Sequence, residues 1–124
     1  MSWRILYVDD EADLREVAQM SLELDPQLEV HSRPSGAQAM RDLPAVRPHL
    51  VLLDVMMPEM DGPATLQRIR GTPEGRDVPI VFITARAGDN DAAKLMALGA
   101  AGVITKPFDP MRLAEQVRAY LPAD

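Results

Sequence analysis

Five short apolar runs alternate along the chain with longer stretches in which apolar residues recur at helical spacing. The short runs are rich in valine, isoleucine and leucine and lie between turn-forming residues, which is typical of strands buried on both faces of a parallel sheet. The predicted strands are Arg4–Val8, Leu28–Ser32, His49–Leu53, Pro79–Ile83 and Gly102–Thr105. The predicted helices are Glu11–Leu24, Gly36–Ala45, Pro63–Arg70, Asn90–Leu98 and Pro110–Tyr120. This alternation predicts an α/β fold with a parallel sheet, right-handed crossovers and helices on both faces.

Residues that start or stop helices lie at the expected boundaries. Ser35 is placed to cap the second helix, and Pro63 falls in the first turn of the third. Gly99 follows the fourth helix, where a left-handed C-terminal cap would lie. The Asp109–Pro110 pair is expected to open the fifth helix as a cap followed by proline. Pro44 is expected to end the second helix early or to kink it.

Polar side chains of catalytic type follow four of the five predicted strands. They are Asp9 and Asp10 after the first strand, Asp54 after the third, Thr84 after the fourth and Lys106 after the fifth. In open α/β sheets the site lies at these carboxyl ends, near the point where the strand order reverses. Three converging carboxylates repel one another, and a hard divalent cation such as Mg²⁺ relieves that repulsion.

Each of these residues also has an ordinary structural explanation. Asp9 and Asp10 would favour the positive end of the first helix, and Asp54 precedes a turn. Thr84 is a common residue in strands, and Lys106 would ordinarily be a solvated charge. Their conjunction at four strand ends is much less expected by accident, so it favours a functional site.

Composition limits the classes of function. The 124 residues suffice for one compact domain and not for two, so a single domain over residues 1–124 is expected. The net charge is −6 and no basic stripe is present, which argues against direct binding of nucleic acid. No apolar run approaches the length of a membrane span, and no signal peptide precedes the first strand. Together with the absence of cysteine, this favours a cytoplasmic protein with no membrane association.

Four motifs, in order, closely resemble the receiver domains of bacterial two-component response regulators, in particular single-domain receivers of the chemotaxis-regulator type. The resemblance covers essentially the whole chain. The motifs are Ile-Leu-Tyr-Val-Asp-Asp-Glu at 5–11, Leu-Asp-Val-Met-Met-Pro-Glu-Met-Asp-Gly at 53–62, Ile-Thr-Ala at 83–85 and Lys-Pro-Phe at 106–108.

The resemblance implies a flavodoxin-like (βα)5 sheet of strand order 2-1-3-4-5, with Asp54 as the phosphorylated residue. By the same resemblance, Asp10 and Asp54 bind Mg²⁺ directly, the Met56 carbonyl is a further ligand, and Asp9 acts largely through water. No cofactor other than Mg²⁺ is implied.

The resemblance also implies roles for residues that contact the phosphoryl group. Lys106 would hold one phosphoryl oxygen, with a cis bond to Pro107, and Thr84 would move to bond another. The implied donor is a phosphohistidine of a histidine kinase or histidine phosphotransfer protein. The chain would then be a monomeric signalling switch rather than an enzyme, acting on a downstream protein that the sequence does not identify. With no output domain after the receiver, we expect it to bind another protein or to relay phosphate.

Two stretches depart from the family's pattern. Many receivers carry an aromatic residue three positions before the lysine, whereas this chain has Val103, so movement of the loop and the fourth helix is expected to carry the signal. Gly99–Gly102 lacks the acidic pair found in many dimerising transcription factors, which disfavours the receiver of a DNA-binding regulator. By the same resemblance, Met56 and Arg86 would occupy the positions that flank the approach of water to the phosphoryl group.

Three alternative functions compete with that of a phosphorylated receiver. A phosphatase of the haloacid dehalogenase type needs a second aspartate two residues after the first, and that position holds Met56. A flavin-binding module needs a phosphate-cradling loop after the first strand, where the acidic residues 9–11 would repel phosphate. A degenerate receiver that only binds partners is disfavoured because the set of site residues is complete.

Overall fold

Five parallel strands form one sheet in the computed structural model, which describes residues 2–122. In chain order the strands are β1 (Trp3–Val8), β2 (Leu28–Arg33), β3 (Leu50–Asp54), β4 (Ile80–Thr84) and β5 (Gly102–Thr105). Their spatial order is β2-β1-β3-β4-β5, and every neighbouring pair is parallel. The predicted strand order 2-1-3-4-5 is therefore confirmed. Each predicted strand is present, with boundaries that differ by at most one residue.

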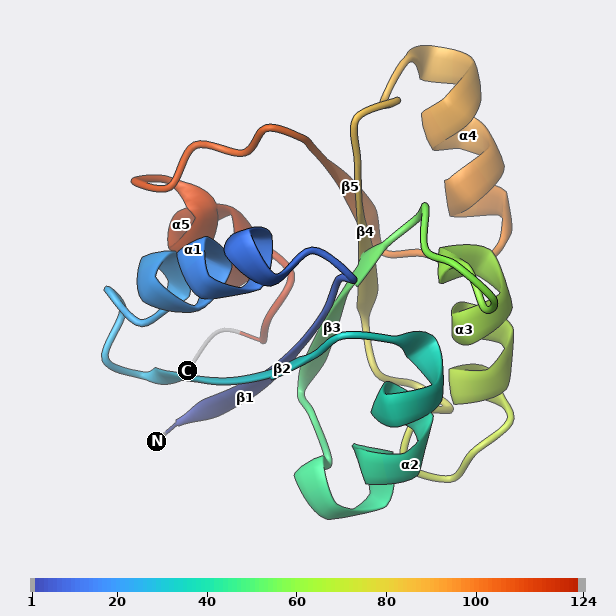
Figure 1. The fold of residues 1–124 in the computed structure, drawn as a ribbon, viewed down its shortest axis with the longest axis horizontal. Coiled ribbons are helices and arrows are strands. Elements are labelled where there is room, and N and C mark those ends of the chain that lie inside the picture. Colours follow the sequence, from blue (N-terminus) through green and yellow to red (C-terminus); the bar gives the residue numbers. More distant parts are fainter. Residues whose placement is uncertain (1, 123–124) are drawn as a thin grey trace.

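Five helices cover the two faces of this sheet (Figure 1). Helices α1 and α5 lie on one face, and α2, α3 and α4 lie on the other (Figure 1). The helices are α1 (Ala12–Leu22), α2 (Gly36–Val46), α3 (Gly62–Arg70), α4 (Asp89–Ala97) and α5 (Leu113–Arg118).

The core is divided by the sheet into two clusters. Along β1, Ile5 and Tyr7 belong to the cluster under α1 and α5, whereas Leu6 and Val8 belong to the cluster under the other three helices. This alternation follows from the two-residue repeat of side chains along a strand. All residues of β3 and β4 are buried, which explains why these strands read as continuous apolar runs.

Most of the predicted helix boundaries are confirmed. The Ser35 hydroxyl accepts a hydrogen bond from the Gln38 backbone N–H, and Pro63 lies in the first turn of α3. Gly99 has a φ of 106°, a conformation that glycine adopts without strain, and its N–H bonds the Met96 carbonyl at the end of α4.

One boundary prediction is wrong, and the early end that was one of the two effects expected of Pro44 is not observed. Helix α5 begins at Leu113 rather than at Pro110. Asp109 caps a preceding turn instead, because its carboxylate accepts from the Met111 N–H and its carbonyl accepts from the Leu113 N–H. Pro44 does not end α2, which continues to Val46. Proline is tolerated there because the helix has only two more residues, so its missing N–H removes one bond of the last turn.

Candidate functional site

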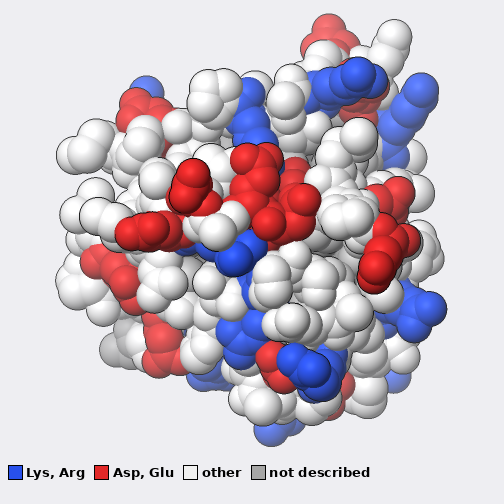
Figure 2. Space-filling view, in the orientation of Figure 1, with Lys and Arg blue, Asp and Glu red and all other residues white. Residues whose placement is uncertain are grey.

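The predicted site residues meet at the carboxyl edge of the sheet. Asp9 directly follows β1, Asp54 and Thr84 are the last residues of β3 and β4, and Lys106 directly follows β5. Strands β2 and β3 pair with opposite edges of β1, so the strand order reverses between β1 and β3. Asp9 and Asp54 lie at the carboxyl ends of these two strands, where sites of open α/β sheets are found. Figure 2 shows acidic side chains gathered over this edge of the sheet.

Three carboxylates form a compact acidic cluster there. Asp9, Asp10 and Asp54 each offer an oxygen, and these oxygens lie within 4.8 Å of one another. Asp9 and Asp54 are buried, whereas Asp10 is exposed. Oxygen ligands of this kind and number suit a hard divalent cation that keeps some of its water, so the donor set is compatible with Mg²⁺.

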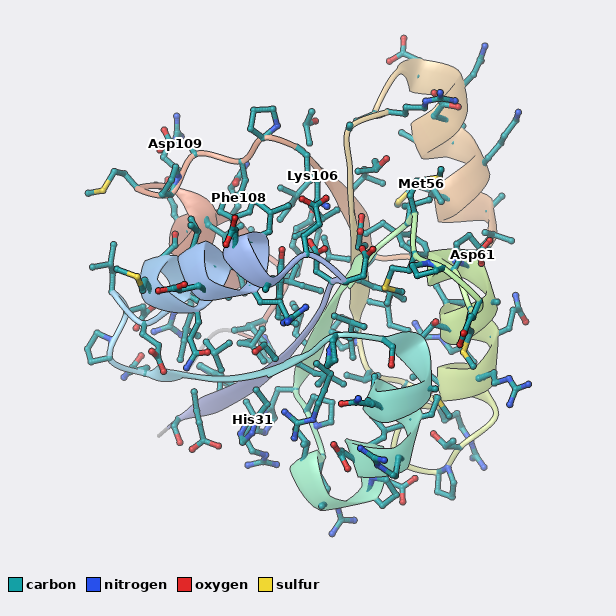
Figure 3. All side chains as sticks on the ribbon, in the orientation of Figure 1. His31, Met56, Asp61, Lys106, Phe108 and Asp109 are labelled. Atoms are coloured by element: carbon teal, nitrogen blue, oxygen red, sulfur yellow. The ribbon has the colours of Figure 1, made fainter. Side chains whose placement is uncertain are left out.

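Lys106 reaches into the cluster from the end of β5, where Figure 3 shows it on the loop above the strand ends. Its Nζ lies 3.1 Å from Oδ2 of Asp9 and 3.1 Å from Oδ1 of Asp54. Burial acts to lower the pKa of Lys106, but the hydrogen bonds and charges of Asp54 and Asp9 outweigh burial, and the pKa is raised. Lys106 is therefore a firmly charged ammonium group between two carboxylates. Its bond to Pro107 is cis, as expected.

Asp54 is the carboxylate most perturbed by this environment. Burial, with the charges of Asp9 and Asp10, raises the pKa of Asp54 from 3.8 to about 6, although Lys106 acts in the opposite direction. Asp54 is thus a carboxylate whose charge is poorly stabilised by the protein alone. A cation bound at the cluster would stabilise the ionised form, which is the nucleophilic one.

The loop after β3 folds back closely over Asp54. The Gly62 N–H bonds the Val55 carbonyl at 2.9 Å. A Cβ atom at position 62 would lie 2.5 Å from the Asp54 carbonyl oxygen, so only glycine permits this approach. The Asp61 carboxylate caps α3 by accepting from the Ala64 N–H, and Figure 3 shows it at the start of that helix.

Met56 and Thr84 lie on the side of the site that faces α4. The Met56 side chain is 74% exposed, and Figure 3 shows it between the loop after β3 and helix α4. Thr84 is buried, and its hydroxyl accepts a hydrogen bond from the Arg86 N–H at 3.0 Å. Met56, Thr84 and Arg86 line a shallow groove of about 150 Å³ together with residues of α4, among them Lys94 and Leu95.

Sequence reasoning missed one residue of the site, Tyr7. Its hydroxyl donates to Oδ2 of Asp9 at 2.9 Å from within the core. Burial and the charge of Asp9 raise the pKa of Tyr7 far above its ordinary value, so the phenol stays protonated and donates. The sequence did contain a signal for this contact. Side chains two residues apart along a strand point to the same face, and Tyr7 precedes Asp9 by two residues.

Comparisons with known proteins identify the family and the fold. Residues 5–118 match the family model of the response regulator receiver domain. The chain is 37% identical over 117 residues to the transcriptional regulatory protein CseB of Streptomyces coelicolor, covering 94% of this chain and 48% of that protein. It is 36% identical to an uncharacterized 14.6 kDa protein of Leptolyngbya boryana, covering 94% of this chain and 88% of the relative. Chemotaxis protein CheY4 of Vibrio cholerae superposes with a TM-score of 0.90 at 26% identity, covering 98% and 100% of the two chains.

The chain spans about half the length of the transcriptional regulators that it matches. Among the described residues, no helix has the length and apolar character needed to cross a membrane. The fold shared with CheY4 and the family match over residues 5–118 show that the chain belongs to the response regulator receiver domain family of two-component signalling.

Proposed function

We propose that Asp54 accepts a phosphoryl group from a phosphohistidine of a histidine kinase or histidine phosphotransfer protein, in a reaction that requires Mg²⁺. The observation that carries the proposal is the position of Lys106, whose Nζ lies 3.1 Å from Asp54 inside a cluster of three carboxylates. A cation and a fixed ammonium group beside one carboxylate are the components that phosphoryl transfer needs.

In the proposed reaction the P–N bond of the phosphohistidine breaks and its electron pair stays on the imidazole nitrogen. A P–O bond forms to a carboxylate oxygen of Asp54, which gives an acyl phosphate. Asp54 is the last residue of β3, so the sheet restricts its backbone, and this restriction would reduce the freedom lost when its carboxylate attacks in line. Lys106 neutralises negative charge on the phosphoryl oxygens, and Thr84 offers a hydroxyl donor from the next strand.

The cation site in this proposal consists of Asp10 and Asp54, the Met56 carbonyl and, through water, Asp9. Bound there, Mg²⁺ would supply the positive charge that keeps Asp54 ionised and offsets the charge of the phosphoryl group. The compact carboxylate cluster supports this assignment.

The proposed output is a change in protein partner, with the domain acting as a monomeric switch and not as an enzyme. Phosphorylation adds nearly two negative charges at Asp54. In the free protein Lys106 is paired with Asp9 and Asp54, and the Thr84 hydroxyl is bonded to the Arg86 N–H. Because both groups would exchange these partners for phosphoryl oxygens, the loop after β4 and the groove beside α4 are the parts expected to change.

Phosphorylation by acetyl phosphate in the presence of Mg²⁺ tests the proposal. Intact-mass measurement is expected to show one added phosphoryl group on the wild type and none on Asp54→Asn, because an amide is not a nucleophile toward phosphorus. Asp61→Asn is the matched control, since Asp61 is exposed and asparagine also caps helices well. Labelling of Asp54→Asn to the wild-type level would refute the assignment.

A further inference from the structure

A buried phenol lies directly beneath the acidic cluster. Tyr7 is only 1% exposed, and its ring belongs to the apolar core under α1 and α5. The hydroxyl is the one polar group of this side chain, and it reaches Oδ2 of Asp9 at 2.9 Å. A phenylalanine ring would occupy the same core volume, so packing alone does not explain the hydroxyl.

The carboxylate of Asp9 is held on both oxygens. Oδ2 accepts from the Tyr7 hydroxyl and also lies 3.1 Å from Lys106 Nζ. Oδ1 accepts from the Glu11 backbone N–H at 3.0 Å, and the Asp9 carbonyl accepts from Arg15 Nη1 at 2.8 Å. Because Asp9 has no exposed surface, water does not readily replace a lost donor.

Tyr7 therefore competes with Lys106 for the same oxygen. The Tyr7 hydroxyl gives Oδ2 a hydrogen-bond donor in addition to the ammonium group, and it fixes the plane of the carboxylate. Without the hydroxyl, Asp9 turns more freely and depends more strongly on Lys106. A tighter Asp9–Lys106 pair is harder to open when a phosphoryl oxygen needs the same ammonium group.

We propose that Tyr7 is a positioning residue, whose hydroxyl holds the Asp9 carboxylate in the orientation that the cation site and Lys106 require. This inference rests on the proposed function, because it assigns Tyr7 a part in that same reaction. Tyr7 touches neither the phosphoryl donor nor Asp54 in this role. It acts through Asp9, as hydrogen-bonded neighbours of metal-binding carboxylates commonly do.

The test compares Tyr7→Phe with Tyr120→Phe. Tyr120 is the chain's second tyrosine and packs against the same core cluster, so it is a matched control for loss of a hydroxyl. The Mg²⁺ dissociation constant is measured by calorimetry for the wild type and both variants, and circular dichroism checks their folds. Tyr7→Phe is expected to weaken Mg²⁺ binding about tenfold, the low end of the range for loss of an outer partner of a metal site, because Asp9 reaches the cation through water. Tyr120→Phe is expected to leave Mg²⁺ binding unchanged.

A spectroscopic signature accompanies the affinity. With tyrosine labelled by ¹³C at Cζ, the Tyr7 signal, identified by its loss in Tyr7→Phe, is expected to shift as Mg²⁺ is added, whereas the Tyr120 signal stays in place. A purely structural hydroxyl would lower the melting temperature in Tyr7→Phe without changing the Mg²⁺ dissociation constant, and that result would overturn the inference. A wild type that binds no Mg²⁺ would instead overturn the proposed function, and the role of Tyr7 with it.

Discussion

Lys106 Nζ lies 3.1 Å from Oδ1 of Asp54, and yet the pKa of Asp54 is raised and not lowered. Burial of the carboxylate and the neighbouring charge of Asp9 outweigh the attraction to the ammonium group. The unphosphorylated site is consequently under electrostatic strain that a cation would relieve. This balance decides the direction of the first prediction.

Replacing Asp54 by asparagine is expected to stabilise the metal-free protein at neutral pH. The pKa of Asp54 is about 6 in the folded protein against 3.8 ordinarily, so the folded state holds the proton more tightly. The wild type therefore loses stability as the pH rises from about 4 through about 6, and below that window the two proteins are equally stable at this site. The difference between these two pKa values corresponds to a loss of at most about 3 kcal/mol in the free energy of unfolding above this pH window.

Urea unfolding in chelator-containing buffer checks this prediction at about pH 7.5 and about pH 4. Asp61→Asn makes the same chemical change at an exposed helix cap and is expected to show no such pH-dependent gain. Equal stabilisation of Asp54→Asn at both pH values would mean that ionisation of Asp54 is not the cause.

Mg²⁺ is expected to raise the melting temperature of the wild type. At a tenfold excess over its dissociation constant, a ligand that binds only the folded state adds about 1.4 kcal/mol, which corresponds to several degrees for a domain of this size. Asp10→Ala is expected to remove most of the shift, because Asp10 is one of the three carboxylates of the cluster and a direct ligand in the proposed cation site. Thermal melts with and without Mg²⁺ measure the effect.

Asp13→Ala is the control for that experiment. Asp13 is exposed in the first turn of α1 and lies outside the acidic cluster. Its removal is expected to lower the melting temperature slightly through the helix dipole while leaving the Mg²⁺-dependent shift intact. If Asp10→Ala keeps the full shift, the cation does not bind at this cluster.

The extent to which sequence predicts this structure depends on the kind of interaction. The strands were predictable because buried parallel strands must be apolar on both faces, and their carboxyl ends then gather Asp9, Asp54 and Lys106. The start of α5 was not predictable, because an aspartate before a proline suits both a helix cap and the turn that the structure shows, and the sequence pattern alone does not decide between them.

The Tyr7–Asp9 hydrogen bond could not be predicted from the sequence either. An aromatic residue in a buried strand is predicted to belong to the hydrophobic core, and the Tyr7 ring is part of that core. Whether the hydroxyl reaches a partner depends on the tilt of the ring against α1 and α5, which is set by packing across the whole cluster. Spacing places Tyr7 and Asp9 on one face but does not fix the 2.9 Å contact.

Replacing Lys106 by methionine is expected to slow phosphorylation by acetyl phosphate about 100-fold or more, because a preorganised charge beside the transferring group typically contributes that much. Methionine keeps most of the length of the side chain and removes the ammonium group with its charge and its hydrogen-bond donors. Lys94→Met is the matched control, since Lys94 is exposed on α4 and is the only other lysine of the chain. Rates of the mass increase measure the effect, and an equal loss of rate in both variants would remove Lys106 from its assigned role.

The lifetime of the phosphorylated state is the last quantity that the site predicts. An acyl phosphate is hydrolysed when water attacks phosphorus in line, so side chains at the mouth of the site control the rate. Met56 stands there with 74% of its surface exposed, beside Thr84 and Arg86 in the groove toward α4. A thioether is bulky and is only a weak hydrogen-bond acceptor, so it excludes water without orienting it.

We expect slow self-dephosphorylation in the wild type. Phosphate release is expected to be about 3- to 10-fold faster in Met56→Asn, the gain that one well-placed hydrogen bond provides. Met96→Asn makes the same replacement at an exposed methionine of α4 and is expected to release phosphate at the wild-type rate. Phosphate release from the purified phosphoprotein measures all three, and an unchanged or slower rate in Met56→Asn would show that Met56 does not control access of water.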